Sequence, residues 1–333
     1  GRSNLTIRSE AHVTRVLLEC SRAAGVEYQC STGMVQVRAG REVILCGGAF
    51  NSPQLLMLSG IGPRDELSRH GIEIRHALEG VGQNLQDHID VFMRVRALSR
   101  LGISMHPSYW LKGMRALLQY LIGRRGVLTS NGAEAGGFIR SRPEESIPDL
   151  QLHFGPMLYA DHGRDFKTAM SGYGYIVMIY GLRPLSRGRV GLHSADPLQA
   201  PLIDPNYMAE TADVEQLVRG VHLVRKILAQ QALESHHDVE ISPGSALRSD
   251  DDLAEWVRTS GESAYHPVGT CKMGVDAMAV VDPRLRVYGL QGLRVVDASI
   301  MPTLVGGNTN QPATMIAEKG AVMILEDAKT TGS

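Results

Sequence analysis

The chain has 333 residues, and 43% of them are hydrophobic, which is more than one ordinary core needs and favours two globular domains. Lys and Arg number 34 against 35 Asp and Glu, so the net charge is -1. No excess of one sign favours nucleic acid or an anionic lipid surface, and no nucleic-acid partner is expected.

The cysteines are few and irregularly spaced, at Cys20, Cys30, Cys46 and Cys271. They form no CxxC pair and indicate neither a disulfide framework nor a zinc site, so we expect no metal. No run of about 18 apolar residues predicts a membrane span. These features favour a cytoplasmic protein and leave peripheral contact with a membrane open.

The first part of the chain reads as strands followed by a helix. Apolar residues alternate in short runs over residues 4–45, which predicts successive strands of a sheet. A glycine turn follows, and the Ser-Pro pair at 52–53 starts a helix to about Leu58. A second short helix begins at Pro63 and stops at Gly71. Strand, glycine turn and helix are the rhythm of an α/β domain.

The middle of the chain has the pattern of an antiparallel sheet. The spacing of apolar residues over 107–122 predicts an amphipathic helix. Residues 148–154 and 172–184 alternate like half-buried strands, and residues 186–194 are predicted as the hairpin partner of the latter.

Helices and a final strand complete the chain. Residues 211–231 are predicted as a long helix, and Ser249 with Asp252 makes a capping box for a helix through Arg258. After Gly261 the pattern returns to glycine turns, a short strand at 293–299, and a closing helix that Pro312 starts near its first turn.

The two ends therefore resemble each other and differ from the middle. We expect an α/β protein, α+β overall. Residues 1–90 and 261–333 would form one discontinuous, partial α/β domain. Residues 91–260 would form an inserted domain built on an antiparallel sheet with flanking helices.

Two segments near the C-terminus are suited to a ligand. Asp297 ends a strand, and ligands gather beyond the carboxyl ends of strands in α/β sheets. The alternative is that Asp297 caps the turn into Ser299. In GGNTNQP, a glycine pair leads into a helix whose free N–H groups suit an anionic ring oxygen such as that of reduced flavin. The alternative is that Asn310 simply caps that helix.

His266 is a candidate general base. It precedes Pro267, which favours an extended backbone that presents the side chain. Imidazole has the unperturbed pKa nearest neutrality, as proton removal from an alcohol requires. The alternative is a structural, hydrogen-bonded histidine, which is the commoner role among the 12 histidines of the chain.

Four segments together resemble the glucose-methanol-choline (GMC) oxidoreductases, and most closely their choline and alcohol dehydrogenase branch. They are GAFNSPQLLMLSGIG at 48–62, GVGQNLQDH at 80–88, YHPVGTCKMG at 265–274, and GLRVVDASIMPTLVGGNTNQP at 292–312. The resemblance implies an FAD-dependent enzyme that oxidises a small primary alcohol, choline-like or aliphatic, to an aldehyde. Electrons would pass to an acceptor, whether a quinone, a carrier or oxygen.

The resemblance also implies roles for individual residues. His266 would be the catalytic base, Asn308 would complete the catalytic pair, and the alcohol carbon would give hydride to flavin N5. Val13 would contact the adenine end of FAD. The residues expected to line the flavin are Asp297, Ala298, Asn308 and Thr309.

One departure from the family pattern is the absence of a GxGxxG turn, which holds the FAD diphosphate in this fold. We therefore expect the C-terminal portion of such an enzyme, without the N-terminal FAD-binding segment. The alternatives to an active enzyme are a non-catalytic or incomplete fragment unable to bind FAD alone, and one part of a split enzyme.

Overall fold

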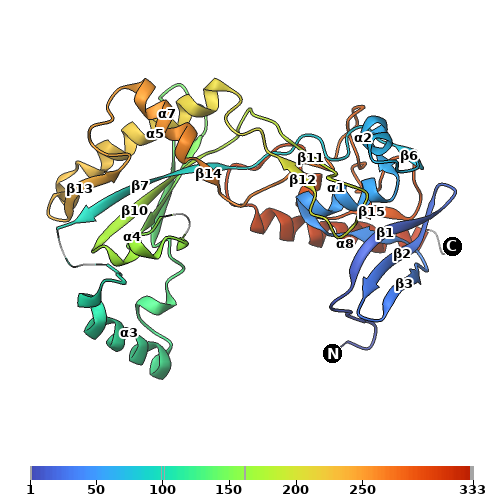
Figure 1. Ribbon diagram of the computed structural model, residues 1–333, viewed down its shortest axis with the longest axis horizontal. Helices are drawn as coiled ribbons and strands as arrows, with labels where there is room; N and C mark the ends of the chain where they lie inside the picture. Colours follow the sequence, from blue (N-terminus) through green and yellow to red (C-terminus); the bar gives the residue numbers. More distant parts are fainter. Residues whose placement is uncertain (1, 99, 101, 161–162, 331–333) are drawn as a thin grey trace. The chain divides into compact units, whose positions relative to one another are not determined.

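The structure combines helices with parallel and antiparallel strands, which confirms the predicted α/β class, mixed overall (Figure 1). It is a computed structural model, and it describes residues 2–98, 100, 102–160 and 163–330.

The chain divides into two compact units. The first contains the residues up to Asp87, Ser186–Tyr207 and the residues from Tyr265 onward. The second contains His88–Leu185 and Met208–Ala264. Each unit has its own cluster of buried apolar side chains. The predicted boundaries place Ser186–Tyr207 in the insertion, whereas this segment packs with the first unit.

The first unit begins with a three-stranded antiparallel sheet. It consists of β1 (His12–Glu19), β2 (Arg22–Cys30) and β3 (Gly33–Arg38), in that order. Alternating apolar residues produce these strands, as predicted, but the residues before β1 form no strand. The sheet places one face of β1 against helix α1.

A parallel strand pair joins the two ends of the chain within this unit. The strand β4 (Val43–Leu45) pairs with β15 (Leu293–Val295), and α1 (Gly48–Leu58) follows β4 directly. Leu56 and Met57 of α1 are fully buried in the core of the unit. Because both strands run in the same direction, their carboxyl ends lie at one edge, where Gly47 and Asp297 follow.

Short elements complete the middle of the first unit. They are α2 (Arg64–Arg69), β5 (Ile61–Gly62), β6 (His76–Ala77), β11 (Arg189–Gly191) and β12 (Leu202–Asp204).

The strand predicted over residues 186–194 has a different partner from the one expected. β11 pairs with β12, so its prediction as the hairpin partner of residues 172–184 is wrong. The reason is a tertiary contact: the backbone N–H of Val190 donates to the carbonyl of Gly82 at 2.7 Å, which draws β11 into the first unit.

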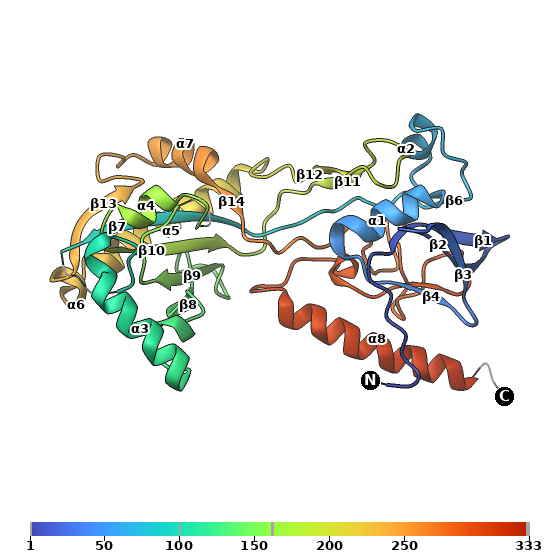
Figure 2. The same ribbon diagram turned by 60° about the horizontal axis from the view of Figure 1, so that its bottom comes forward.

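A short 3-10 turn and a long helix end the first unit. The turn η4 (Ala298–Ile300) follows β15, and α8 (Asn310–Thr330) closes the chain, as predicted. Figure 2 shows α8 as one continuous helix beside the strands of this unit. An ion pair holds α8 against β15: the guanidinium of Arg294 in β15 contacts Asp327 of α8 at 2.7 Å.

The second unit is built on a six-stranded antiparallel sheet. Its path is β13-β7-β10-β9-β8, and β14 also pairs with β7. The bounds are β7 Ile89–Ala97, β8 Ala135–Ile139, β9 Leu150–Gly155, β10 Gly174–Gly181, β13 His237–Ser242 and β14 Glu262–Ser263. The central strand β10 is buried along its whole length, so both faces of the sheet are covered there.

Helices flank this sheet, as the sequence predicts. They are η1 (Pro107–Tyr109), α3 (Trp110–Gly123), η2 (Val127–Thr129), α4 (Phe166–Met170), α5 (Thr211–Leu228), α6 (Gln231–Glu234) and α7 (Asp250–Ser260). Buried residues of α5 recur every three or four positions and face the sheet. The backbone N–H of Asp252 donates to the Ser249 side chain at the start of α7, which confirms the predicted cap.

Candidate active site

The backbone around His266 is held in an unusual conformation. The preceding Tyr265 has a φ of +62°, in the left-handed region that side chains other than glycine seldom adopt. The backbone N–H of His266 donates to Asp87 Oδ1 at 2.8 Å. Asp87 Oδ2 accepts a hydrogen bond of 2.6 Å from the Tyr207 hydroxyl. Because Asp87 is buried and both of its oxygens are engaged, it fixes the position of the His266 backbone.

The imidazole of His266 lies against the amide of Asn308. The distance between His266 Nε2 and Asn308 Nδ2 is 3.1 Å. An amide nitrogen only donates, so in this arrangement Nε2 is the acceptor and carries a lone pair. An imidazole nitrogen that accepts a hydrogen bond in this way is the kind that can act as a base. The two residues that the sequence singles out as a pair are therefore in direct contact.

Gln86 connects the segment of His266 to the segment of Asn308. Its backbone exchanges hydrogen bonds with Val268 at 2.9 and 3.1 Å. Its side-chain oxygen accepts from the Leu304 N–H at 3.1 Å, and its amide nitrogen donates to the Pro302 carbonyl at 3.2 Å. The side chain is buried, so these bonds are made without competition from water. Gln86 thereby sets the spacing between the two candidate catalytic residues.

Asn308 and Thr309 precede the first turn of α8. The Thr309 carbonyl accepts from the Ala313 N–H at 2.9 Å, so this residue is in the capping position of the helix. The first N–H groups of a helix have no partner inside it, and the helix dipole makes this end electropositive. This end of α8 is thus suited to a group that becomes negatively charged.

The Asp297 carboxylate accepts hydrogen bonds from three groups of the protein. Its Oδ2 accepts from the Ser52 hydroxyl at 2.6 Å and from the Gly48 N–H at 3.0 Å, and its Oδ1 accepts from the Ser299 N–H at 2.8 Å. The capping alternative is therefore realised, and it places Ala298 in the turn that follows. A carboxylate offers about four lone pairs, so one on Oδ1 remains for a further donor.

Val13 lines a cavity that extends to the end of β4. The cavity has a volume of about 460 Å³ and lies in the first unit between β1, β4 and α1. Besides Val13, its walls include Cys46 and Gly47, at the carboxyl end of β4, and Ser52, whose hydroxyl binds Asp297. The structure thus brings Val13 and Asp297, which are far apart in the sequence, to one connected region.

Thiol chemistry and a metal centre find no support at this edge. Desolvation by the surrounding atoms, together with the negative charge of Asp297, raises the pKa of the Cys46 thiol, so the thiol is protonated at neutral pH. Within the described part of the chain, no group of three or more His, Cys, Asp or Glu side chains is placed to hold a metal ion.

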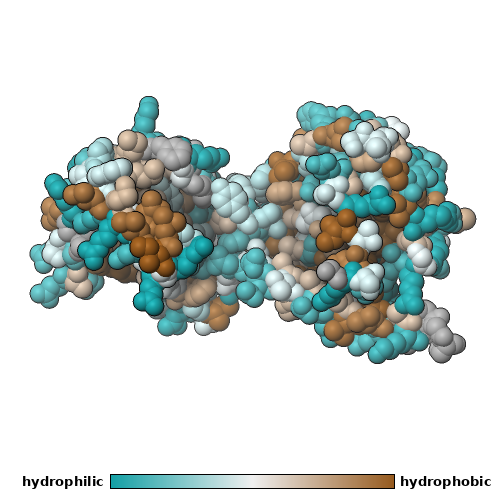
Figure 3. Space-filling view, turned by 90° about the horizontal axis from the view of Figure 1, so that it is seen from below, coloured by the Kyte–Doolittle hydropathy of each residue, from teal (hydrophilic) through white to brown (hydrophobic). Residues whose placement is uncertain are grey.

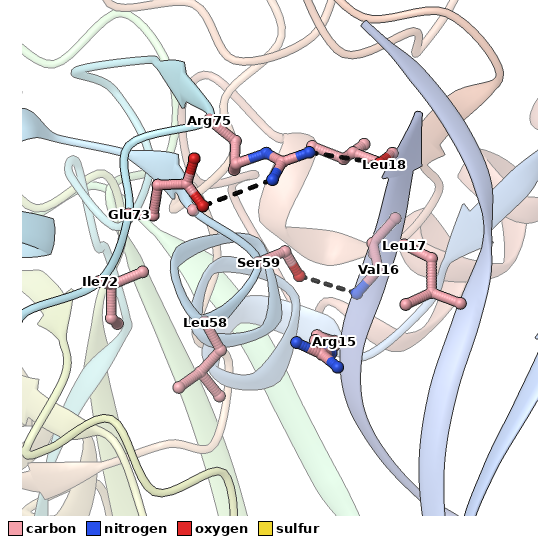
Figure 4. A pocket seen from close by; sticks show the side chains of 10 residues that line it. Arg15, Val16, Leu17, Leu18, Leu58, Ser59, Ile72, Glu73 and Arg75 are labelled. Atoms are coloured by element: carbon pink, nitrogen blue, oxygen red, sulfur yellow. Dashed lines mark hydrogen bonds and ion pairs between the residues drawn. The ribbon is translucent and has the colours of Figure 1, made fainter. Parts of the chain in front are cut away.

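A second pocket, of about 340 Å³, lies between β1 and the end of α1 (Figure 4). The Ser59 hydroxyl accepts from the Val16 N–H at 2.8 Å and donates to the Leu55 carbonyl at 2.6 Å. Glu73 and Arg75 form an ion pair at its rim, with a distance of 3.4 Å. Each of these polar groups already has a partner within the protein. The pocket contains none of the predicted site residues.

Comparison with known families identifies the chain. The C-terminal family model described as GMC oxidoreductase matches residues 184–317, and the N-terminal model of the same family matches residues 1–90. The chain belongs to the GMC oxidoreductases. The matched regions contain Val13, His266, Asn308 and the residues that hold them in place. The enzymes of this family are FAD-dependent oxidoreductases.

Curated GMC relatives are similar over nearly the whole chain. An alcohol dehydrogenase [acceptor] of Pseudomonas putida is 49% identical over 97% of this chain and 58% of its own length. A mitochondrial choline dehydrogenase of Homo sapiens is 45% identical over 97% of this chain and 54% of its own length. The chain thus spans little more than half the length of these relatives.

Solved GMC structures have the same fold. A formate oxidase of Aspergillus oryzae RIB40, studied for FAD modification, matches with a TM-score of 0.91 at 30% identity, over 98% of this chain and 62% of that one. A pyridoxine 4-oxidase matches with a TM-score of 0.82 at 29% identity, over 96% of this chain and 58% of that one.

One expectation from the sequence is not supported. The lack of a GxGxxG turn predicts a C-terminal portion without the N-terminal FAD-binding segment, yet residues 1–90 match the N-terminal GMC model. The match includes the strands and helices over residues 12–77, which lie outside any GxGxxG turn. A search for one short motif cannot detect that match.

Sequence reasoning missed the residues that position the pair. Asp87 and Gln86 lie in GVGQNLQDH, a segment that the resemblance marks but to which no role was assigned. The sequence does hint at their role. Polar Gln86 and Asp87 lie just before the apolar residues of β7, a position that favours buried hydrogen bonds over contact with water.

Proposed function

We propose that the protein is an FAD-dependent oxidoreductase that converts a small primary alcohol, choline-like or aliphatic, to an aldehyde. The observation that carries the proposal is the contact of 3.1 Å between His266 Nε2 and Asn308 Nδ2 beside the start of α8. A neutral imidazole and an amide donor are the two groups that an alcohol oxygen needs, one to take its proton and one to bind its lone pair.

The chain's own residues supply the proton chemistry. An alcohol whose hydroxyl replaces the Asn308 amide at His266 Nε2 gives its proton to that nitrogen and accepts a hydrogen bond from Asn308 Nδ2. As the proton leaves, the oxygen gains negative charge, which the amide N–H stabilises. The C–H bond then breaks with both electrons, and a carbonyl forms. Bound FAD supplies the acceptor for that hydride.

The first unit offers features that fit FAD. The cavity of about 460 Å³ beside Val13 has mostly apolar walls, suited to the adenine end. The remaining lone pair of Asp297 suits a ribose or ribityl hydroxyl, and Gly47 and Gly48 allow close approach at the end of β4. The start of α8, with Asn308 and Thr309, suits the pyrimidine side of the flavin. These features support a flavin site in the first unit.

The first test is retention of flavin. The purified chain is incubated with excess FAD, passed through gel filtration and examined by visible absorption. We expect a flavin band to remain with the protein. A colourless protein would favour the incomplete-fragment and split-enzyme alternatives, which differ in whether a second polypeptide restores binding.

The second test concerns the base. With flavin bound, His266→Ala is expected to slow alcohol-dependent flavin reduction by a factor of about 10² or more while flavin content stays the same. His193→Ala, at an exposed histidine of the same unit, is the matched control. Equal reduction rates in His266→Ala and wild type would remove His266 from the base role. Reoxidation by a quinone, a carrier or oxygen then identifies the acceptor.

A further inference from the structure

Helix α3 exposes an apolar face. Figure 1 shows α3 projecting from the second unit, and Ala116 is the residue that it buries. Large apolar side chains stand in solvent, with exposed fractions of 67% for Trp110, 79% for Leu111 and 85% for Ile122. In Figure 3, viewed from the side on which α3 projects, hydrophobic side chains gather in a patch on this unit. Patches of this kind mark interaction sites.

The exposed side chains share one side of the helix. Successive residues turn by about 100°, so positions three, four and seven apart lie together. The face covers roughly a third of the circumference. Its members are Trp110, Leu111, Met114, Leu117, Leu118, Leu121 and Ile122. Val127 and Leu128 of η2, which follow directly, are exposed as well and extend the same apolar surface.

The segment that carries this face has charges of one sign. Between Leu98 and Ala133 the sequence contains no Asp or Glu, whereas the chain as a whole has 35 of them. The cations of this segment are Arg100, Lys112, Arg115, Arg124 and Arg125. Lys112 and Arg115 lie on the helix next to the apolar face, and Arg124 and Arg125 follow its last turn. Cations beside an apolar stripe favour an anionic surface with an apolar interior.

We propose that α3 and η2 lie on the surface of a bilayer that contains anionic lipid, with the apolar face in the acyl boundary and the cations at the head groups. Trp110 sits at the start of α3, where an amphipathic ring suits the interface. Binding is in the plane of the membrane, because α3 has 14 residues and a length of about 21 Å, shorter than the hydrocarbon core. Among the described residues, no helix has the length and apolarity to span a bilayer.

The charge pattern argues against a second copy as the occupant. A two-fold contact would bring the same face of two chains together, and with it Lys112 and Arg115 of both. Like charges beside a buried apolar contact repel, and α3 carries no carboxylate to offset them. An anionic head group removes this repulsion, so the lipid surface is the occupant that both the apolar and the charged residues suit.

The test is co-sedimentation of the full 333-residue chain with vesicles of phosphatidylcholine containing phosphatidylserine. We expect Leu111→Gln with Ile122→Gln to lower the partition coefficient by roughly tenfold or more, because two apolar side chains leave the acyl boundary. Both residues are exposed and Gln is a good helix former, so the fold is retained. Val275→Gln, at a residue that is 87% exposed in the first unit, is the matched control and should bind like wild type.

The charges are tested separately. Lys112→Gln with Arg115→Gln should weaken binding to phosphatidylserine vesicles severalfold and reduce its salt dependence, with a smaller effect on pure phosphatidylcholine. Trp110 fluorescence should shift to the blue on binding, with Trp110→Phe to separate it from Trp256. Wild type that stays in the supernatant, or variants that bind as wild type does, would overturn the proposal. Apolar variants that change only the oligomeric state would assign the face to a second copy.

Discussion

Buried polar residues around His266 matter as much as the histidine itself. Asp87 fixes the His266 backbone, and Gln86 fixes the distance from that segment to the one that carries Asn308. Both are buried, so the loss of either leaves partners without hydrogen bonds in a place that water does not reach easily. The base is therefore only as well placed as these neighbours allow.

Asp87→Ala should lower the free energy of unfolding by about 1–3 kcal/mol, because the buried N–H of His266 loses its acceptor. Asp87→Asn should restore most of this, since its amide oxygen still accepts from that N–H. Tyr207→Phe, which keeps the hydrogen bond between Asp87 and the His266 N–H, should cost less. Urea unfolding of the three variants checks the order. Asp87→Ala as stable as wild type would show that the bond contributes nothing.

At this scale the sequence predicted the reactive groups but not their supports. His266 and Asn308 belong to short motifs with a chemical logic of their own, and the structure places them in contact. Asp87 and Gln86 act on partners 179 and 218 residues away, and no local pattern encodes such pairs. Whether Val13, Asp297, Ala298 and Thr309 line a flavin stays a prediction.

Among the elements, α8 is attached to the strand pair by an ion-pair network. Arg294 of β15 is buried and contacts Glu42 at 2.6 Å and Asp327 of α8 at 2.7 Å. Asp327 also contacts Arg284 at 2.7 Å. A buried guanidinium needs its carboxylates, because an unpaired charge in the interior is costly. The position of α8, and with it that of Asn308, therefore depends on Asp327.

This dependence predicts acid sensitivity. The hydrogen bond from Arg294, followed by that from Arg284, lowers the pKa of Asp327. A folded-state pKa below the unfolded value means that the stabilisation is complete above the unfolded pKa, about 3.9, and is lost as the pH falls through the lower folded value. Asp327→Asn should be less stable than wild type at about pH 6 and should lose less stability on going to about pH 3.

Urea unfolding at a series of pH values measures that difference. Glu318→Gln removes an exposed carboxylate from the same helix and serves as the control. Parallel pH curves for wild type and Asp327→Asn would show that the ion pairs do not couple to folding.

Most elements were predictable because their signals are local. The cap at Ser249, the periodicity of α5 and the alternation of β1 to β3 lie within a few residues of the structure that they specify. The pairing of β11, in contrast, depends on residues far away in the sequence. Alternation predicts a strand there but says nothing about its partner, and the contact with Gly82 outweighs nearness in sequence to β10. The sequence therefore predicts the strand but not the strand with which it pairs.

Over the whole molecule, the two units have separate cores. Leu56 is fully buried in the first and Ile179 in the second. Either residue changed to Ala should cost about 2–5 kcal/mol through lost burial and a cavity. Leu56→Ala should raise amide hydrogen exchange in β1 and α1 and leave β10 protected, and Ile179→Ala should do the reverse. Exchange that rises equally throughout would indicate one cooperative core.

The net charge of the whole chain gave no indication of the local group of cations near α3. A net charge of -1 gave no reason to expect an anionic surface as partner, yet the segment around α3 carries cations without a single carboxylate. Averages over 333 residues cannot report a patch of fewer than 40. The helix itself was predicted from its periodicity, but only the fold reveals that its apolar side is uncovered.

The assembly of the first unit from distant segments bears on how the protein is made. The hydroxyl of Ser52 meets Asp297 across 245 residues, so α1 lacks this contact, and β4 lacks its parallel partner β15, when they leave the ribosome. At synthesis rates of about 5–20 residues per second, the interval is roughly 10–50 s. The second unit, which ends at Ala264, can complete its sheet while the first still waits. Newborn chains thus expose the edge formed by β4 and α1 for longest, and protection by chaperones matters most there.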